Sequence, residues 1–207
     1  MNRFTEGIFP GQLEPDITLA GCIDIFENVW PNPDLLIEAV EYESSMPDSD
    51  LRWGRAGTFG DGPYQSKRTN YEICITQAAD LYGNKLAKDI HNQMYFMLLA
   101  ATLPYYQKHN LSQNMHHEYY NLLRYQGGQE YLAHYDGGGE SRRVVSAILY
   151  LNDDYEGGEI EFPNFDIKIK PQAGMLILFP SNYAYTHIAH PVTEGTKYAI
   201  VTWLYEG

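Results

Sequence analysis

The two parts of the chain differ in how hydrophobic and polar positions alternate. Beyond residue 115 the apolar positions fall into short runs, rich in β-branched and aromatic residues and separated by Gly, Asn, Asp and Pro. Such runs predict β-strands, because turn residues end each run before a helical period can develop. The predicted strands cover 117–126, 131–136, 143–151, 159–162, 166–170, 174–179, 185–189 and 198–205. About eight short antiparallel strands at this spacing are typical of a jelly roll.

The first part of the chain has a mainly helical pattern. One or two short strands are expected near the start, for example 22–26, and apolar positions then recur at helical spacing after Pro33. A second helical region runs from residue 71, with a break expected at 83–84. We expect it to end before Pro104, because proline cannot donate a helical hydrogen bond.

Residues 44–70 are rich in Gly, Ser, Asp and Pro and predict a long loop. A lid over a site is one interpretation, since long loops in compact domains are often functional; irregular surface is the simpler alternative. No repeat or linker divides the chain. We therefore expect one domain, 1–207, with mainly helical support and loop in 1–114 and a β core in 115–207.

Composition narrows the classes of partner. The chain has 207 residues, enough to bury a sizeable core, and 27 acidic residues against 14 basic ones give a formal charge of −13. This charge repels phosphate backbones and makes nucleic acid an unsuitable partner. It would attract a basic peptide, although an acidic surface that serves only solubility is the simpler explanation.

Compartment is indicated by the cysteines and the N-terminus. Cys22 and Cys74 are too few for a disulfide framework and lack metal-ligand spacing, so we expect free thiols in a reducing compartment. The N-terminus lacks an apolar signal core, and no apolar run is long enough to span a bilayer. These features predict a cytoplasmic protein without a membrane partner.

Candidate chemistry begins with His134 and Asp136. If 131–136 is a strand, the two side chains project from the same face, since side chains two apart on a strand do so. An imidazole beside a carboxylate provides two ligands of the 2-His-1-carboxylate triad that binds Fe(II). A third ligand would come from a distant strand. His187 and His190 both qualify, and because they face opposite ways on a strand, spacing alone does not choose between them.

Five ordered segments of the second part, 123–136, 143–152, 157–163, 171–180 and 187–197, resemble the prolyl 4-hydroxylase family of Fe(II)- and 2-oxoglutarate-dependent dioxygenases. Trp203 ends the matching region. The first 110 residues match only loosely, as a helical support. The resemblance implies an α+β fold, in which a double-stranded β-helix (jelly-roll) core of about eight antiparallel strands is buttressed by N-terminal helices.

The resemblance also implies the roles of individual residues. His187 becomes the third metal ligand beside His134 and Asp136, and His190 becomes structural. Lys197 falls where the family's basic residue binds the remote carboxylate of 2-oxoglutarate, a charge pairing that a cation in a cavity can make. Tyr150 resembles a tyrosine that donates a hydrogen bond to the same carboxylate, and Tyr125 is placed with it in the 2-oxoglutarate site.

Tyr131, Arg143 and Trp203 align with positions that line the substrate entrance in algal-type enzymes. For the two aromatic residues a place in the core is the alternative, and for Arg143 a plain surface charge. Two features depart from the family pattern. Ile160 stands where many relatives have a threonine that helps hold the cosubstrate, and the turn at 137–141 is short where peptide-binding relatives often have a longer loop.

The expected function is hydroxylation of prolyl residues in a protein or peptide, with release of succinate and CO₂. It would require Fe(II), 2-oxoglutarate and O₂, with ascorbate as reductant. The same chemistry on a free amino acid, another side chain or a small molecule is the first alternative, because fold does not determine substrate. The second is a catalytically silent β-sandwich module that binds a dicarboxylate or a metal. The oligomeric state cannot be predicted from these motifs.

Overall fold

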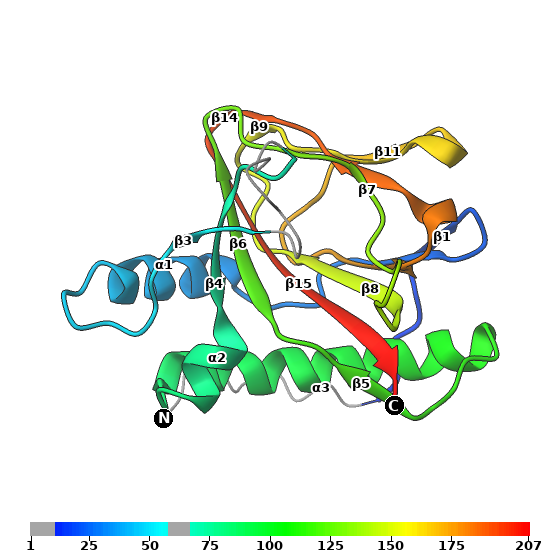
Figure 1. Ribbon diagram of the computed structural model, residues 1–207, viewed down its shortest axis with the longest axis horizontal. Helices are drawn as coiled ribbons and strands as arrows, with labels where there is room; N and C mark the ends of the chain where they lie inside the picture. The colour runs from blue at the N-terminus through cyan, green and yellow to red at the C-terminus, as the bar shows by residue number, and fades with distance from the viewer. Residues whose placement is uncertain (1–10, 58–66) are drawn as a thin grey trace.

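The computed structural model describes residues 11–57 and 67–207. Its strands pair antiparallel in two sheets and one short ribbon (Figure 1). The nine-stranded major sheet has the order β1 (Ile17–Leu19), β2 (Ile23–Phe26), β12 (Leu176–Pro180), β8 (Arg143–Tyr150), β15 (Thr196–Glu206), β6 (Asn121–Gln126), β4 (Tyr71–Cys74) and β3 (Gly54–Arg55), and β5 (Met115–His117) also pairs with β15. The minor sheet has the order β11 (Ile167–Ile169), β10 (Ile160–Phe162), β13 (His187–Ala189) and β7 (Tyr131–His134), and the ribbon pairs β14 (Val192–Glu194) with β9 (Glu156–Gly157).

The two sheets pack against each other through a buried apolar layer, which confirms the predicted jelly-roll core. Ile177 and Phe179 of β12 and Tyr150 of β8 meet Ile160 and Phe162 of β10 in this layer. Because successive side chains of a strand point to opposite faces, one face of each major strand lies in this layer and the other lies outside it.

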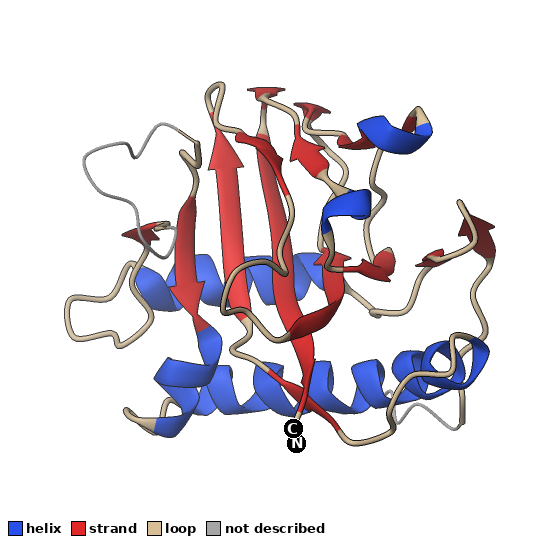
Figure 2. Cartoon of the chain, turned by 45° about the vertical axis from the view of Figure 1, so that its right-hand side comes forward, coloured by secondary structure: helices blue, strands red, loops and turns tan. Residues whose placement is uncertain are grey.

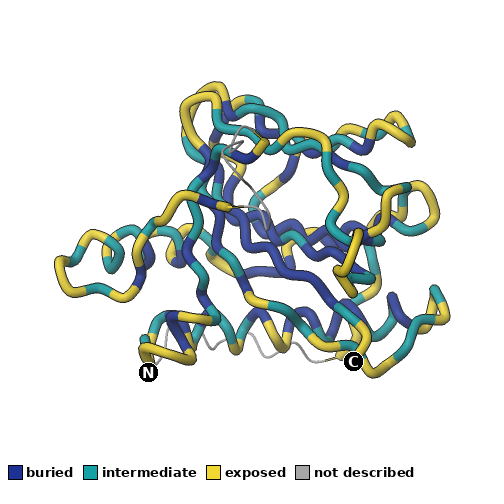
Figure 3. Tube along the Cα trace, in the orientation of Figure 1, coloured by how far each residue is buried: buried dark blue, intermediate teal, exposed yellow. Residues whose placement is uncertain are grey.

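The outer face of the major sheet is covered by helices, which confirms the α+β class. On β8, Val145, Ala147 and Leu149 alternate with the inward residues and join a second core with the helices. The helices are α1 (Pro33–Ser44), α2 (Ile75–Asp80) and α3 (Lys85–Lys108). Figure 2 shows them together, behind and beneath the long strands. The central strands are accordingly the most completely buried part of the trace (Figure 3).

The longest helix, α3, passes through Pro104 instead of ending before it, so this sequence prediction is wrong. Proline has no N–H to donate to the carbonyl of Ala100, one turn earlier. That carbonyl instead accepts a hydrogen bond from the backbone N–H of Leu13, at 2.9 Å. The lead-in segment thus satisfies the acceptor that the proline leaves open, and the helix continues.

The first part of the chain contributes more to the sheet than its pattern predicted. Strands β1 to β4 all belong to the major sheet, and β4 pairs with β6 along four residues. The predicted strand 117–126 is in fact two strands, β5 and β6. Between them the N–H of Tyr120 donates to the Thr76 hydroxyl at 2.9 Å, so the chain leaves the ladder there.

The segment 44–70 is only partly described, because 58–66 lie outside the described residues. Its last residues are held in place. The N–H of Leu132 donates to the carbonyl of Lys67 at 2.9 Å, and the N–H of Thr69 donates to that of Glu130 at 3.1 Å. Residues 67–70 therefore run along the outer edge of β7 before entering β4. Among the described helices, none has the length and apolar character needed to cross a membrane.

Candidate active site

A cavity of about 1050 Å³ lies between the two sheets and holds most of the candidate residues. Strands β6, β8 and β15 line one side of it, and β7 and β13 line the other. Arg68, from the segment before β4, and Glu72 of β4 line one flank. The site is therefore built from residues that are far apart in the sequence and that only the pairing of the sheets brings together.

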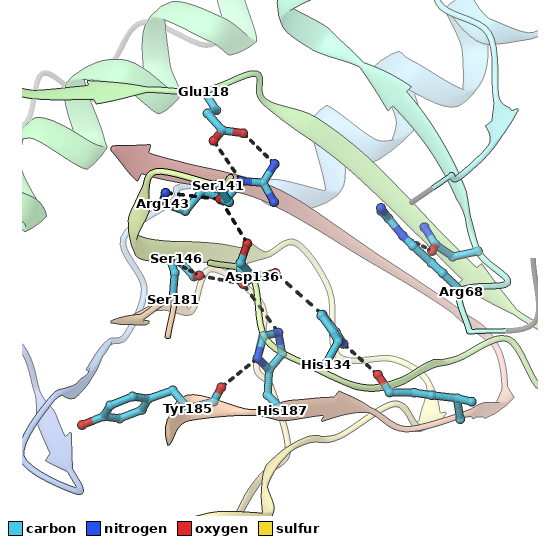
Figure 4. Close-up of polar contacts among 12 residues, drawn as sticks. Arg68, Glu118, His134, Asp136, Ser141, Arg143, Ser146, Ser181, Tyr185 and His187 are labelled. Carbon is cyan, nitrogen blue, oxygen red and sulfur yellow. Dashed lines mark hydrogen bonds and ion pairs between the residues drawn. The ribbon is translucent and has the colours of Figure 1, made fainter. Parts of the chain in front are cut away.

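The structure brings together His134, Asp136 and His187 on one wall of this cavity (Figure 4). One potential ligand atom from each residue lies within 4.8 Å of the others. The two imidazoles come from directly paired positions of β7 and β13, and side chains of paired residues point to the same face. His190 lies away from this group, with its Nε2 2.6 Å from a carboxylate oxygen of Glu161.

Asp136 reaches the site from beyond the end of its strand. Strand β7 ends at His134, so the strand geometry on which the sequence argument relied does not apply to Asp136. Its Oδ1 lies 3.8 Å from Nε2 of His134 and its Oδ2 lies 3.7 Å from Nε2 of His187. The turn that follows is closed by the N–H of Gly137, which donates to the carbonyl of Ser181 at 2.7 Å.

Both imidazoles are oriented by hydrogen bonds on the side away from Asp136. Nδ1 of His134 lies 2.7 Å from the carbonyl oxygen of Leu132, and Nδ1 of His187 lies 3.1 Å from that of Tyr185. A carbonyl oxygen only accepts, so Nδ1 carries the proton in each ring and Nε2 is left with its lone pair. The two lone pairs point toward the carboxylate.

Burial and neighbouring charges set the protonation of the group. Burial, together with the nearby His187, lowers the pKa of His134 to about 3, so this imidazole is neutral near pH 7. Burial raises the pKa of Asp136, but His187, His134 and the hydrogen bond from Ser146 outweigh it and hold the pKa below its ordinary value. A neutral imidazole and an ionised carboxylate are the forms that bind metal.

The donor set of two imidazole nitrogens and one carboxylate oxygen fits Fe(II). The 2-His-1-carboxylate arrangement occupies one face of the ion and leaves positions open for substrates. Here the open side is the cavity, which is lined by all three residues. The residues present are therefore suited to the metal that the sequence resemblance implies.

Lys197 lies in the same cavity and is 2% exposed. Its ammonium donates a hydrogen bond to the carbonyl of Gly158 at 2.6 Å and lies 5.0 Å from the ring centre of Tyr150 and 5.5 Å from that of Tyr125. Burial lowers the pKa of Lys197 to about 7, and the negative charge of Glu159 partly opposes this shift. Among the residues that the structure describes, no carboxylate forms an ion pair with this buried cation, which favours an anionic ligand because burial of an unpaired charge is costly.

Tyr125 and Tyr150 both line the cavity beside Lys197. Burial raises the pKa of each phenol, so both keep their protons and can donate hydrogen bonds. Ile160 also lines this part of the cavity and is buried. It offers an apolar surface where a threonine would offer a hydroxyl.

The three residues expected at the substrate entrance line the cavity but differ in their contacts. Tyr131 stacks on His134, with ring centres 3.4 Å apart and an interplanar angle of 13°. Arg143 is ion-paired: its Nε and Nη2 donate to the two carboxylate oxygens of Glu118 at 2.8 and 2.6 Å. The guanidinium also lies 3.6 Å from the ring centre of Trp203.

Sequence reasoning missed four residues of the site, and three of them lie near the triad. Ser146 donates a hydrogen bond to Asp136, and Ser181 forms one with Ser146. Arg68 lies 5.2 Å from the ring centre of Tyr131. The fourth, Glu118, pairs with Arg143. Arg68 is buried, and its Nε and Nη2 donate to Asn70 and Glu72 at 2.9 and 3.1 Å. The alternation of β8 could have placed Ser146 on the inner face; no local signal marks the others.

Comparison with known proteins supports the same assignment. Residues 120–205 match the model of the 2OG-Fe(II) oxygenase superfamily. "Probable prolyl 4-hydroxylase 9" of Arabidopsis thaliana is 35% identical over 118 residues, which cover 43% of this chain and 41% of that protein. Human "Prolyl 3-hydroxylase 2" is 42% identical over 66 residues, which cover 30% of this chain and 9% of that protein. The chain thus corresponds to less than half the length of either relative.

The fold has a close counterpart among solved structures. A prolyl hydroxylase from Trichoplax adhaerens, in complex with a hypoxia inducible factor peptide fragment, superposes with a TM-score of 0.70. The superposition covers 90% of this chain and 84% of that one, at 18% sequence identity, and shows a shared fold. Residues 120–205 are thus similar to the 2OG-Fe(II) oxygenase superfamily, and the chain is prolyl 4-hydroxylase-like.

Proposed function

We propose that this prolyl 4-hydroxylase-like 2OG-Fe(II) oxygenase hydroxylates a prolyl residue of a protein or peptide and converts 2-oxoglutarate to succinate and CO₂. The observation that carries the proposal is the position of Lys197, a buried cation, in the same cavity as the His134, Asp136 and His187 group. Within 11–57 and 67–207, no carboxylate is ion-paired with it. One wall of the cavity suits a metal and the other suits a dicarboxylate.

His134, Asp136 and His187 would hold Fe(II), which together with 2-oxoglutarate and O₂ supplies the oxidation of an unactivated C–H bond. Lys197 would anchor the remote carboxylate of 2-oxoglutarate, and the protonated hydroxyl of Tyr150 would donate to it, with Tyr125 beside them. The buried apolar side chain of Ile160 would help to exclude water from this end of the cavity. The chain's own contribution is therefore orientation and a dry environment.

The substrate would enter where the cavity is lined by Tyr131, Arg143 and Trp203. Tyr131 stacks on His134, so its ring would lie beside the metal site. Arg143 donates hydrogen bonds to Glu118, so part of its guanidinium group is already occupied. Arg143 would therefore form a fixed wall over Trp203 and would not act as a free cation. Such a wall favours a neutral, compact side chain such as proline.

A prolyl residue is favoured by the relatives, which are named as prolyl 4- and prolyl 3-hydroxylases, and by the neighbour whose complex contains a hypoxia inducible factor peptide. The position of the new hydroxyl group on the ring is a separate question, since both types of name occur. The same chemistry on a free amino acid, another side chain or a small molecule is the alternative within this class. A silent dicarboxylate- or metal-binding module is the alternative outside it.

We further propose that residues 1–207 act as one domain, because β1 to β4 share the major sheet with β6, β8, β12 and β15. The free thiols of Cys22 and Cys74 support a reducing compartment such as the cytoplasm. Ascorbate would serve as reductant to return oxidised iron to Fe(II).

The experiment incubates the purified protein with Fe(II), 2-oxoglutarate, ascorbate and a panel of proline-containing peptides. Mass spectrometry follows peptide oxygenation, and succinate is measured in the same tubes. His187→Ala should abolish both signals, whereas His190→Ala, which alters a histidine outside the triad, should retain them. A one-oxygen gain on proline supports the proposal, and separation of the hydroxyproline isomers identifies the ring position.

Other outcomes distinguish the alternatives. Succinate release stimulated by free amino acids but by no peptide would favour a small-molecule hydroxylase. A folded, iron-loaded protein that consumes no 2-oxoglutarate under any of these conditions would contradict the enzyme proposal and favour the binding module.

A further inference from the structure

We infer that Ser146 and Ser181 form a hydroxyl relay that fixes the Asp136 carboxylate in the orientation required of a metal ligand. The two serines would be positioning residues that do not themselves touch metal or substrate. This inference rests on the proposed function, because it treats His134, Asp136 and His187 as a metal site.

The relay is a short, buried chain of three side chains. Oγ of Ser146 lies 2.6 Å from Oδ2 of Asp136 and 2.8 Å from Oγ of Ser181. Ser146 is 0% exposed and Ser181 is 1% exposed. Figure 4 shows both hydroxyls on the side of Asp136 opposite His134. Water is excluded there, so these hydroxyl groups depend on one another for hydrogen bonds.

The ionised carboxylate determines the direction of the chain. A carboxylate that binds a metal ion is deprotonated, so both oxygens of Asp136 are acceptors in the proposed site. Ser146 must therefore donate its single proton to Oδ2, and Ser181 must donate to Ser146. A hydrogen bond to an ionised acceptor is about twice as strong as one between neutral groups, and its neighbour in the chain is polarised and strengthened as well.

The backbone beside the carboxylate is tied to the same point of the fold. The N–H of Gly137 donates to the carbonyl of Ser181 at 2.7 Å, and the N–H of Ser181 donates to that of Val144 at 2.9 Å. Ser181 directly follows β12, and Ser146 lies on β8 next to it. Both the side chain and the main chain of Asp136 are thus anchored to the edge where β8 and β12 pair.

This anchoring has a geometric consequence for the whole triad. His134 and His187 belong to β7 and β13 of the minor sheet, whereas the carboxylate is held by β8 and β12 of the major sheet. The relay therefore joins the carboxylate to one sheet while the imidazoles belong to the other. Without it, the side chain of Asp136 could rotate, and the distances of 3.7 and 3.8 Å to the two Nε2 atoms would no longer be fixed.

The test is a titration with Mn(II), used as the probe without 2-oxoglutarate, in which free Mn(II) is followed by electron paramagnetic resonance. Wild type should bind one ion, and Ser146→Ala should bind it about tenfold more weakly, the loss typical of removing a hydrogen bond to a metal ligand. Ser181→Ala should show a smaller loss in the same direction. Ser146→Thr keeps the hydroxyl and should restore an affinity close to that of wild type.

Thr102→Ala is the matched control, because it removes another fully buried hydroxyl, one that donates to Leu98 within α3. It should lower thermal stability without changing Mn(II) affinity. If folded Ser146→Ala and Ser181→Ala both bind Mn(II) as tightly as wild type, the relay is overturned. If Ser146→Ala does not fold, Ser146→Thr and Ser181→Ala decide by the same criteria. If wild type itself binds no Mn(II), the proposed function fails instead.

Discussion

The guanidinium of Arg143 lies 3.6 Å from the ring centre of Trp203, and the two residues form one wall of the cavity entrance. Glu118 fixes this arrangement through two hydrogen bonds of 2.8 and 2.6 Å. The carboxylate comes from the short link between β5 and β6, so a residue outside any strand determines where the arginine lies.

Glu118→Gln should release Arg143 and weaken peptide binding. A hydrogen bond to a charged group contributes about 1.5–3 kcal/mol, and because this pair is partly exposed we expect about 1 kcal/mol, or about a fivefold rise in peptide KM. Steady-state kinetics with a peptide substrate measure it. The Kd for 2-oxoglutarate should not change, and Glu140→Gln, which removes another rim carboxylate, is the control. An unchanged peptide KM would contradict the role given to Glu118.

Binding of 2-oxoglutarate should weaken as the pH rises above about 7, because burial lowers the pKa of Lys197 to that value. Only the ammonium form of Lys197 pairs with a carboxylate, so the 2-oxoglutarate dianion binds that form. Above about pH 7, binding is therefore accompanied by uptake of a proton at Lys197. The Kd should be constant below the pKa and rise about tenfold per pH unit above it. Calorimetry with Mn(II)-loaded protein, in buffers of different ionisation enthalpy, measures the Kd and the proton uptake together.

Lys197→Met provides the control for this pH dependence. Truncating one partner of a buried charge pair costs about 2–5 kcal/mol, so the Kd should rise about 30-fold or more. The remaining binding should no longer take up a proton between pH 7 and 9. A wild-type Kd that is independent of pH in this interval would count against Lys197 as the anchor.

Gly137→Ala should weaken metal binding even when no substrate is present. A Cβ atom at this position would lie 2.6 Å from the carbonyl oxygen of Arg143 and 3.1 Å from Cβ of Ser181, so the turn after Asp136 has to move. We expect Mn(II) affinity to fall about tenfold or more. Gly54→Ala, where the nearest atom to the new Cβ is a Glu72 oxygen at 3.9 Å, should bind Mn(II) like wild type. Equal affinities of the two variants would show that the turn tolerates the methyl group.

Leu178→Ala should destabilise the fold by about 2–5 kcal/mol, because this fully buried side chain packs β12 against the helices and its loss leaves a cavity. Equilibrium unfolding in urea measures the change. Leu35→Ala, on the exposed side of α1, should change the free energy of unfolding by no more than about 0.5 kcal/mol. Similar values for both variants would contradict the assignment of the outer core.

The sequence by itself determined the class of the fold and most of its strands. Period-two patterns in β8, β12 and β15 are local properties, and each is readable because one face meets the helices and the other meets the minor sheet. The ordered segments from 123 to 197 likewise carried the family resemblance, because closely spaced motifs do not depend on how the chain folds. His134 and His187 could be nominated in this way.

Tertiary structure decided how those elements meet, because long-range contacts leave little trace in local pattern. The carbonyl of Ala100 is satisfied by Leu13, which lets α3 continue through Pro104 against its intrinsic preference. The place of β4 in the major sheet follows from its pairing with β6. The four-residue sequence of β4 does not predict this pairing. Contacts of this kind overrule propensity because each satisfies a backbone group or buries apolar surface.

The site shows the same division between local and long-range information. The residue types of His134, Asp136 and His187 suggested a metal, but Asp136 lies past the end of its strand. It is placed by the hydrogen bond from Ser146 and by the one that the next residue, Gly137, donates to the main chain at 181. The lowered pKa of Lys197 depends on burial. The ion pair of Arg143 with Glu118 depends on a partner distant in sequence. Residue identity determined which groups are available for chemistry. Packing of the two sheets decided which of these groups face one another, because the distance between side chains on different strands is set by neither strand alone.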